Sequence, residues 1–254
     1  MFVKALLVAI WAGIAGIDYF DGLTHIHRPL VTGLVIGIIL GDIKTGLVVG
    51  ATLELVWMGM VPLAGAQPPN VVIGGVIGTS IAILGKLDPQ AAVGLAVPFA
   101  VAAQACITLL FTAFSPVMHK ADKYAEEADT KGIEKVNYIG LIGLFCFYSI
   151  IAFLVIYFGA DKAETMVNVI PKWLIDGLSV AGGMMPAIGF AMLLKIMFKK
   201  EYTAYLLIGF VLVTYGKLPI LAIALVGLAI ALYDYFSKGN AQVVVAKEDY
   251  EDGI

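Results

Sequence analysis

Apolar segments of limited length follow one another through most of this chain, and their lengths restrict the fold more than any other feature. A helix that crosses a bilayer alone needs about 20 apolar residues, with a range of about 17–25. Segments 91–114, 138–158 and 177–198 reach that length easily, and 218–236 is borderline. The segments that are too short to cross alone are 3–17, 30–41, 47–61, 71–84 and 204–215. Charged residues make up only 14% of the chain, whereas soluble domains carry about 25%. The sequence therefore predicts an all-α integral membrane protein.

Several of the short segments form interrupted pairs. Segments 30–41 and 47–61 are separated around Gly41–Gly46, and segments 204–215 and 218–236 are separated by Gly216-Lys217-Leu218-Pro219. Short apolar segments interrupted by Gly or Pro indicate half-helices or re-entrant hairpins near a binding site. We therefore predict a polytopic bundle with broken half-helices. The alternative is a simple bundle whose spans extend into their loops.

One long polar segment and a polar tail lie outside the apolar segments. The run SPVMHKADKYAEEADTKGIEKVN from Ser115 mixes lysines with acidic residues, in a pattern that predicts an amphipathic surface helix between Pro116 and Asn137. The closing KEDYEDGI from Lys247 is acidic and too polar to bury. We expect a polytopic membrane domain at 1–236 and a polar, acidic tail at 237–254.

Glu54 is the candidate functional residue with the clearest physical argument. It lies inside the otherwise uncharged run LVVGATLELVWMGMV, which starts at Leu47. A carboxylate at membrane depth costs about 2.5–3.5 kcal/mol on insertion scales, so it is tolerated when it faces a polar cavity or a partner. Glycine and proline flank the run on both sides, which predicts non-helical backbone beside a cavity. Residues 41–70 are therefore predicted to form the substrate site of a transporter. The alternative is that Glu54 pairs with Lys44 or Arg28 and joins two helices.

The residues around Glu54 indicate a small polyol as the substrate. Carboxylates and amides hydrogen-bond several hydroxyls at once, while an aromatic face packs against the C–H side of a sugar ring. Trp57 follows Glu54 by three residues and shares its face on a helix. Gln67 and Asn70 lie on a proline-rich turn that could fold over that face. The alternative for these two amides is that they cap helix ends.

Several other kinds of chemistry are not expected. The sequence has no P-loop, which argues against ATP use by this chain. His25 and His27 are two residues apart and do not share a helix face, so we expect no metal site. The net charge is −3 and no Lys/Arg run suggests nucleic acid. We expect no catalytic residue and no cofactor on this chain.

Two long motifs resemble a known family of membrane proteins. The run HRPLVTGLVIGIILGDIKTGLVVGATLEL from His27 resembles the N-terminal hallmark of mannose-class enzyme IIC subunits of the phosphotransferase system (PTS). The run WLIDGLSVAGGMMPAIGFAMLLKIM from Trp173 resembles the second conserved block of that family. The similarity extends along nearly the whole chain. Within the class, VWMGMVPLAGAQPPN from Val56 and the closing EDGI resemble the branch specific for N-acetylgalactosamine and galactosamine.

The resemblance implies a multi-pass subunit of the bacterial inner (plasma) membrane with defined partners. A homologous enzyme IID subunit would complete the membrane complex, as a trimer of IIC–IID pairs with a moving core and a static scaffold. The pair would bind an amino sugar outside and release it inside as its 6-hydroxyl is phosphorylated. The phosphate would come from a histidine of a separate cytoplasmic IIB protein, supplied by IIA. This chain itself would not be phosphorylated.

The resemblance also adds candidate substrate-binding residues. Glu54 falls in the TLEL segment of the family, and Asp42 falls in its GDxxTG segment. Gln67 and Asn70 lie where the sugar loop of the branch is expected, whereas Asp21 and His27 match the polar stretch that leads into HRP. Together with Trp57, the predicted substrate-binding residues are Glu54, Gln67, Asn70, Asp21, His27, Asp42 and Trp57.

Two other function classes remain open at the level of sequence. Broken helices and one buried carboxylate would also suit a stand-alone, ion-coupled secondary transporter that uses Glu54 as a proton or sodium site. A membrane receptor or docking protein that binds partners through its acidic tail is the non-transport alternative.

Overall fold

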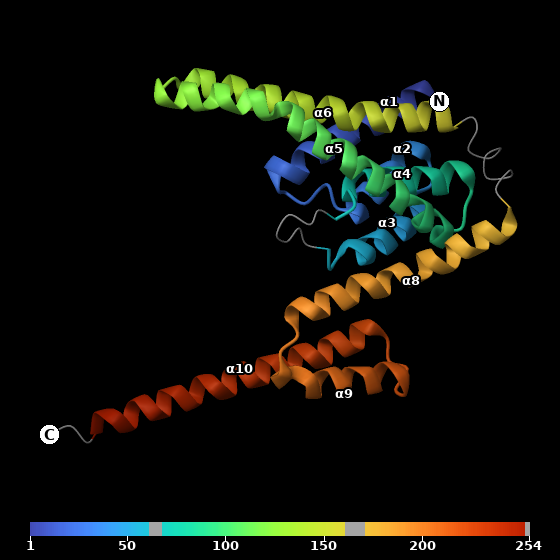
Figure 1. The fold of residues 1–254 in the computed structure, drawn as a ribbon. Coiled ribbons are helices and arrows are strands. Elements are labelled where there is room, and N and C mark those ends of the chain that lie inside the picture. The colour runs from blue at the N-terminus through green and yellow to red at the C-terminus, as the bar shows by residue number, and fades with distance from the viewer. Residues whose placement is uncertain (61–67, 161–170, 252–254) are drawn as a thin grey trace. The chain divides into compact units, whose positions relative to one another are not determined.

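The computed structural model describes residues 1–60, 68–160 and 171–251. It describes the side chains of all of these except 160 and 238–251. Every regular element in the described residues is helical. The elements are α1 (Phe2–Ile17), the π-helix η1 (Asp18–Gly22), α2 (Pro29–Leu40), α3 (Ile43–Trp57), α4 (Val71–Gly85), α5 (Pro89–Glu126), α6 (Thr130–Ala160), α8 (Lys172–Met197), the 3₁₀-helix η2 (Lys200–Tyr202), α9 (Thr203–Thr214) and α10 (Ile220–Glu251) (Figure 1). They divide into two compact units, Met1–Ile196 and Met197–Ile254. Five helical stretches among the described residues are long and apolar enough to cross a membrane. The predicted all-α membrane fold is confirmed.

The first interrupted pair folds as a tight hairpin of α2 and α3. Gly41 ends α2 with a positive φ of 97°, which lets the chain reverse. A Cβ at Gly33 would overlap the Gly46 carbonyl oxygen and lie 2.9 Å from the Gly50 Cα. A Cβ at Gly46 would in turn lie 2.9 Å from the Gly37 Cα. Two GxxxG motifs, one on each helix, therefore permit backbone-to-backbone contact.

Helix α4 occupies the centre of the first unit. It contacts α1, α2, α3, α5 and α6, and most of its side chains are buried. Fifteen residues give a helix of about 22 Å at 1.5 Å per residue, which is shorter than the roughly 30 Å of a bilayer core. A short helix of this kind is stable at membrane depth because protein covers its ends and faces. The predicted half-helices are thus confirmed for α4 as well as for the α2–α3 hairpin.

Helices α1 and α6 pack along each other at one side of α4. A Cβ at Gly16 would overlap the Tyr148 ring, and one at Gly13 would meet Ser149 and Phe145. The Ser149 hydroxyl donates to the Ala9 carbonyl oxygen at 2.9 Å. Small residues on α1 therefore bring α6 close enough to place the Tyr148 hydroxyl inside the unit.

Two predictions from segment length are wrong. Segment 3–17 was expected to be too short to cross, but η1 continues α1 without a break, and the apolar stretch runs from Phe2 to Gly22. The polar stretch that begins at Ser115 is not a separate surface helix. Instead α5 continues to Glu126 and α6 begins at Thr130, so these residues form the end of a long α5–α6 hairpin that extends past the neighbouring helices of its unit (Figure 1). A charged stretch can continue a membrane helix once that helix has left the bilayer.

The second unit contains the other interrupted pair. Helix α9 ends at Thr214, α10 begins at Ile220, and the two contact each other as a hairpin. Lys217 between them has a positive φ of 48°. The boundary that we predict at residue 237 between membrane domain and tail stays a prediction, and the side chains beyond it are outside the described ones.

Candidate functional site

A cavity of about 410 Å³ lies in the first unit, where η1, the loop that follows it, the end of α3 and the start of α4 meet. Its volume falls within the roughly 300–1,000 Å³ typical of small-molecule sites. Aromatic and apolar side chains form much of its wall. The polar and aromatic side chains that line it are those of Tyr19, Phe20, His25, His27, Arg28, Trp57 and Gln104. An apolar wall with a few convergent polar groups is typical of a ligand site.

Arg28 and Glu54 form an ion pair beside this cavity. The Arg28 Nε donates to Glu54 Oε1 at 2.6 Å, and Nη2 contacts the same oxygen. The backbone N–H of Leu30 lies 3.4 Å from Glu54 Oε2. The Arg28 side chain is 33% exposed and that of Glu54 is 21% exposed. The pairing that we gave as the alternative for Glu54 is therefore present, with Arg28 and not Lys44 as the partner. Arg28 is one of the residues that line the cavity, and Glu54, which is not, pairs with it beside the wall.

Trp57 forms a buried part of the wall at the end of α3. Its side chain is 3% exposed, and its indole N–H has no hydrogen-bond partner among the described residues. Gly74 of α4 makes room for the ring, because a Cβ there would overlap the six-membered part of the indole. A buried indole N–H usually has a partner, so this donor is an exception among the described residues.

Asn70 connects three helices at the other side of the cavity. Its Oδ1 accepts from the Ile73 N–H at 2.9 Å and so caps α4. Its Nδ2 donates to the Tyr148 hydroxyl at 2.7 Å and lies 3.4 Å from Gln104 Oε1. The side chain is fully buried. The capping role that we gave as the alternative for Asn70 is therefore present, and Asn70 holds Gln104 at the cavity wall.

His27 reaches the cavity through a buried pair with Asp18. The His27 Nδ1 lies 2.6 Å from Asp18 Oδ2, and both side chains are almost fully buried. The Tyr19 ring meets the imidazole edge-on, with 5.2 Å between the ring centroids. The ring is therefore fixed on two sides, and Nε2 is the nitrogen that remains for other partners.

Asp42 and Asp21 are not among the described residues that line the cavity. Asp42 caps α3, since its carboxylate accepts from the Thr45 N–H at 3.0 Å and the Thr45 hydroxyl at 2.6 Å. These hydrogen bonds from Thr45 lower the pKa of Asp42. Twelve residues separate Asp42 from Glu54, which corresponds to about 18 Å along α3. Asp21 is exposed on η1, and Gln67 lies outside the described residues.

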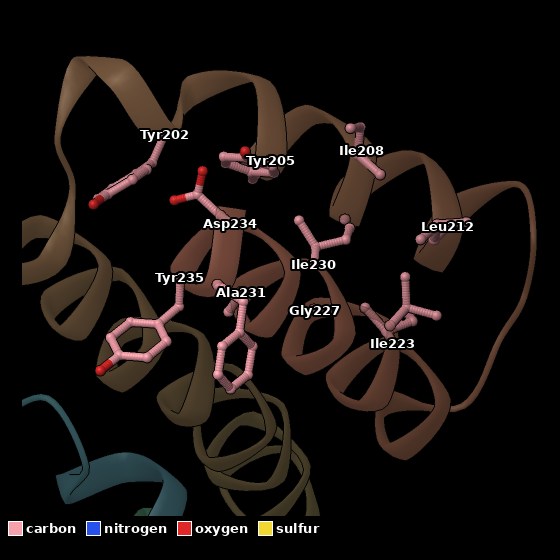
Figure 2. A pocket seen from close by; sticks show the side chains of 13 residues that line it. Tyr202, Tyr205, Ile208, Leu212, Ile223, Gly227, Ile230, Ala231, Asp234 and Tyr235 are labelled. Carbon is pink, nitrogen blue, oxygen red and sulfur yellow. The ribbon is translucent and has the colours of Figure 1, made fainter. Parts of the chain in front are cut away.

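A second, larger cavity of about 780 Å³ lies between α9 and α10 of the second unit (Figure 2). Ile208, Leu212, Ile223 and Ile230 point into the gap, and Tyr202, Tyr205 and Asp234 gather at one end (Figure 2). No residue of α9 is buried, and neither is any part of the apolar window in Ile220–Ser237. The gap is thus an uncovered face of a two-helix hairpin, so we place the candidate site in the first unit.

Sequence reasoning did not select four residues that organise the site. The sequence indicated Arg28 only as a possible partner of Glu54, and Asp18 was not among the predicted site residues. Gln104 and Tyr148 lie inside long apolar segments. A signal for Gln104 was available, because a polar side chain inside a membrane segment is costly and marks a functional position.

Comparisons with known proteins decide the family. The family described as the PTS system sorbose-specific IIC component matches residues 2–233. The N-acetylgalactosamine permease IIC component 1 of Escherichia coli (strain K12) is 37% identical over 261 residues, covering 99% of this chain and 98% of that protein. The chain belongs to the sorbose/mannose-class PTS IIC family.

Solved structures agree with this membership. A structure described as a membrane protein matches with a TM-score of 0.83 and 29% identity, over 92% of this chain and 96% of that one. The mannose transporter ManYZ, solved by cryo-electron microscopy in complex with microcin E492 (MceA), matches with a TM-score of 0.59 and 29% identity, over 92% of this chain and 95% of that one. This IIC chain is thus a multi-pass membrane protein and a sugar-translocation subunit that works with other PTS components.

Proposed function

We propose that this IIC chain binds N-acetylgalactosamine or galactosamine and carries it inward as it is phosphorylated. The observation that carries the proposal is the cavity beside the Arg28–Glu54 pair, where charged, amide and aromatic groups converge. Such groups recognise a ring with several hydroxyls and apolar C–H faces. The choice of amino sugar is supported by the 37% identity to a relative named as an N-acetylgalactosamine permease.

Four of the predicted residues, Glu54, Trp57, His27 and Asn70, receive a specific part in this proposal, together with Arg28 and Gln104. The Arg28 guanidinium, held by Glu54, donates to sugar hydroxyls, and the lone pair of Glu54 Oε2 that the Leu30 N–H does not use accepts from one. The Trp57 ring packs against the sugar, and its unpartnered N–H donates to a sugar oxygen. His27 offers Nε2, and Gln104 offers its amide at a position set by Asn70. Charge-assisted bonds of the Arg28–Glu54 kind are the stronger ones, so this pair dominates affinity.

Phosphoryl transfer belongs to partner proteins in this proposal. An enzyme IID subunit completes the membrane complex as a trimer of IIC–IID pairs, and a phosphohistidine of IIB, recharged by IIA, phosphorylates the sugar 6-hydroxyl. The match to the ManYZ structure supports a two-subunit membrane complex. The stand-alone ion-coupled alternative is less favoured, because Arg28 already neutralises the carboxylate that would hold the ion.

The test is uptake and phosphorylation in cells that lack only this chain. Loss of N-acetylgalactosamine and galactosamine phosphorylation, restored by the chain supplied in trans, is expected. Unimpaired phosphorylation of both sugars would refute the proposed substrate. Ion-driven transport by the purified chain alone, reconstituted without partners, would favour the secondary transporter instead.

A further inference from the structure

Asp18 is a buried carboxylate that neither the predicted site nor the comparisons assign. Its side chain accepts four hydrogen bonds from two residues. Oδ1 accepts from the Thr24 N–H at 2.6 Å and the Thr24 hydroxyl at 2.5 Å. Oδ2 accepts from the His27 N–H at 3.1 Å and from His27 Nδ1 at 2.6 Å. Burying a carboxylate is costly unless its lone pairs are satisfied, and here about four acceptor positions meet four donors.

The local backbone is shaped around this carboxylate. Asp18 begins the π-helix η1, which closes with the Leu23 N–H on the Asp18 carbonyl oxygen at 2.8 Å. Leu23 and His25 both have positive φ, at 49° and 66°, a conformation that is uncommon for residues other than glycine. A Cβ at Gly22 would lie 2.9 Å from Asp18 Oδ1. Unfavourable backbone conformations persist only where surrounding contacts determine them, and the hydrogen bonds of Asp18 are those contacts.

The loop that Asp18 holds supplies one wall of the cavity. His25, His27 and Arg28 all follow η1 and all line it. Because the Asp18 carboxylate can only accept, His27 Nδ1 carries the proton, and Nε2 of a neutral ring is left as an acceptor. Asp18 therefore determines both the orientation of the imidazole and the nitrogen that can accept a hydrogen bond.

We propose that Asp18 is a positioning residue for sugar binding, acting through His27, which it fixes with Nε2 as an acceptor toward the cavity. The inference rests on the proposed function, because it takes the ligand to be an amino sugar with hydroxyl donors. The competing explanation is that Asp18 only keeps the loop folded, with no specific effect through the imidazole.

The experiment uses the complete membrane complex of this chain with its partner subunit, in lipid nanodiscs. Binding of N-acetylgalactosamine is measured for wild type, Asp18→Asn, His27→Gln and the double variant, with Asp122→Asn as a matched control on an exposed carboxylate. We expect each single variant at Asp18 or His27 to bind about tenfold or more weakly, and the control to bind as wild type. In the double variant, Asp18→Asn should add less than about twofold to the His27→Gln loss, since residues that act as a unit are not additive.

A second readout does not require a stable Asp18 variant. The chain has three histidines, so ¹⁵N labelling of histidine can resolve the His27 ring by comparison with His27→Gln. We expect wild-type His27 with Nδ1 protonated and Nε2 bare. Protonation at Nε2 instead, normal binding by Asp18→Asn, or losses at Asp18 and His27 that multiply in the double variant would each overturn the inference. A wild-type complex that binds no amino sugar would instead overturn the proposed function on which it rests.

Discussion

Replacing Glu54 by Gln tests the proposed site most directly, because it keeps the shape of the side chain and removes its charge. Glu54 holds the Arg28 guanidinium through Nε and Nη2, and beside the Leu30 N–H its Oε2 keeps one lone pair for a sugar hydroxyl. Hydrogen bonds to charged groups contribute about 1.5–3 kcal/mol each. At about 1.4 kcal/mol per tenfold in affinity, we expect Glu54→Gln to weaken amino-sugar binding by about 10- to 100-fold.

The same change should leave the membrane complex assembled. Exposed ion pairs contribute up to about 1 kcal/mol, whereas breaking a fully buried pair costs about 3–5 kcal/mol. The Arg28 side chain is 33% exposed and that of Glu54 is 21% exposed, so this pair lies between the two cases. We therefore expect Glu54→Gln to lower the free energy of unfolding by about 1–2 kcal/mol. A glutamine oxygen can still accept from Arg28, so the cation is not left without a partner.

The assay pairs two measurements on the purified complex with its partner subunit. Calorimetry gives the Kd for N-acetylgalactosamine, and size-exclusion chromatography gives the yield of intact complex. Glu134→Gln, on an exposed residue of α6, is the matched control. The double variant Arg28→Gln/Glu54→Gln separates ligand binding from charge neutralisation. Normal binding by Glu54→Gln, or binding restored in the double variant, would remove Glu54 from the sugar site.

Three further substitutions have outcomes set by particular contacts. Gly74→Ala should weaken sugar binding and cost about 1–3 kcal/mol of stability by overpacking the Trp57 ring. Gly75→Ala is the control and should be tolerated, because its Cβ would meet only ordinary contacts near 3.5 Å. Equal Kd values and melting temperatures for the two variants would contradict this. Asn70→Ala should lower both the melting temperature and the affinity for sugar. It removes a helix cap worth about 1 kcal/mol and leaves the buried Tyr148 hydroxyl without its donor, at a cost of about 1–3 kcal/mol. A change in affinity alone would mean that the hydrogen bonds of Asn70 do not stabilise the fold. Asp42→Ala should cost about 1 kcal/mol of stability with unchanged sugar Kd, and weaker binding would return Asp42 to the site.

The helices were largely predictable from the sequence because membrane segments must be apolar and helical throughout. The interruption at Gly41–Gly46 correctly located the α2–α3 hairpin. The prediction that segment 3–17 is too short to cross was wrong because Asp18 and Asp21 end the apolar run, although the helix continues as η1. A hydropathy pattern ends an apolar segment at a carboxylate. Asp18 is nevertheless buried, because its carboxylate accepts hydrogen bonds from Thr24 and His27.

The candidate site was predictable only in part, because partners distant in sequence decide each role. Glu54 and Arg28 were recognised as a possible pair from their charges. The hydrogen bond from Asn70 to Tyr148, 78 residues away, depends on how α4 and α6 pack. A local sequence pattern carries no information on that packing. Asp42 is acidic and lies in a family motif, as Glu54 does, yet its carboxylate accepts from the Thr45 N–H and so caps α3.

The glycines of the α2–α3 hairpin and the charges of the site depend on each other. Arg28 precedes α2 and Glu54 lies near the end of α3, so the hairpin brings them together only in one register. Contact of Gly33 with Gly46 and Gly50 fixes that register, because any side chain there would force the backbones apart. A shift of one residue would turn Glu54 by about 100° around α3 and leave its charge without Arg28. The insertion cost of Glu54 is therefore offset by a cation that glycine packing, about one to two turns away on α3, holds in place.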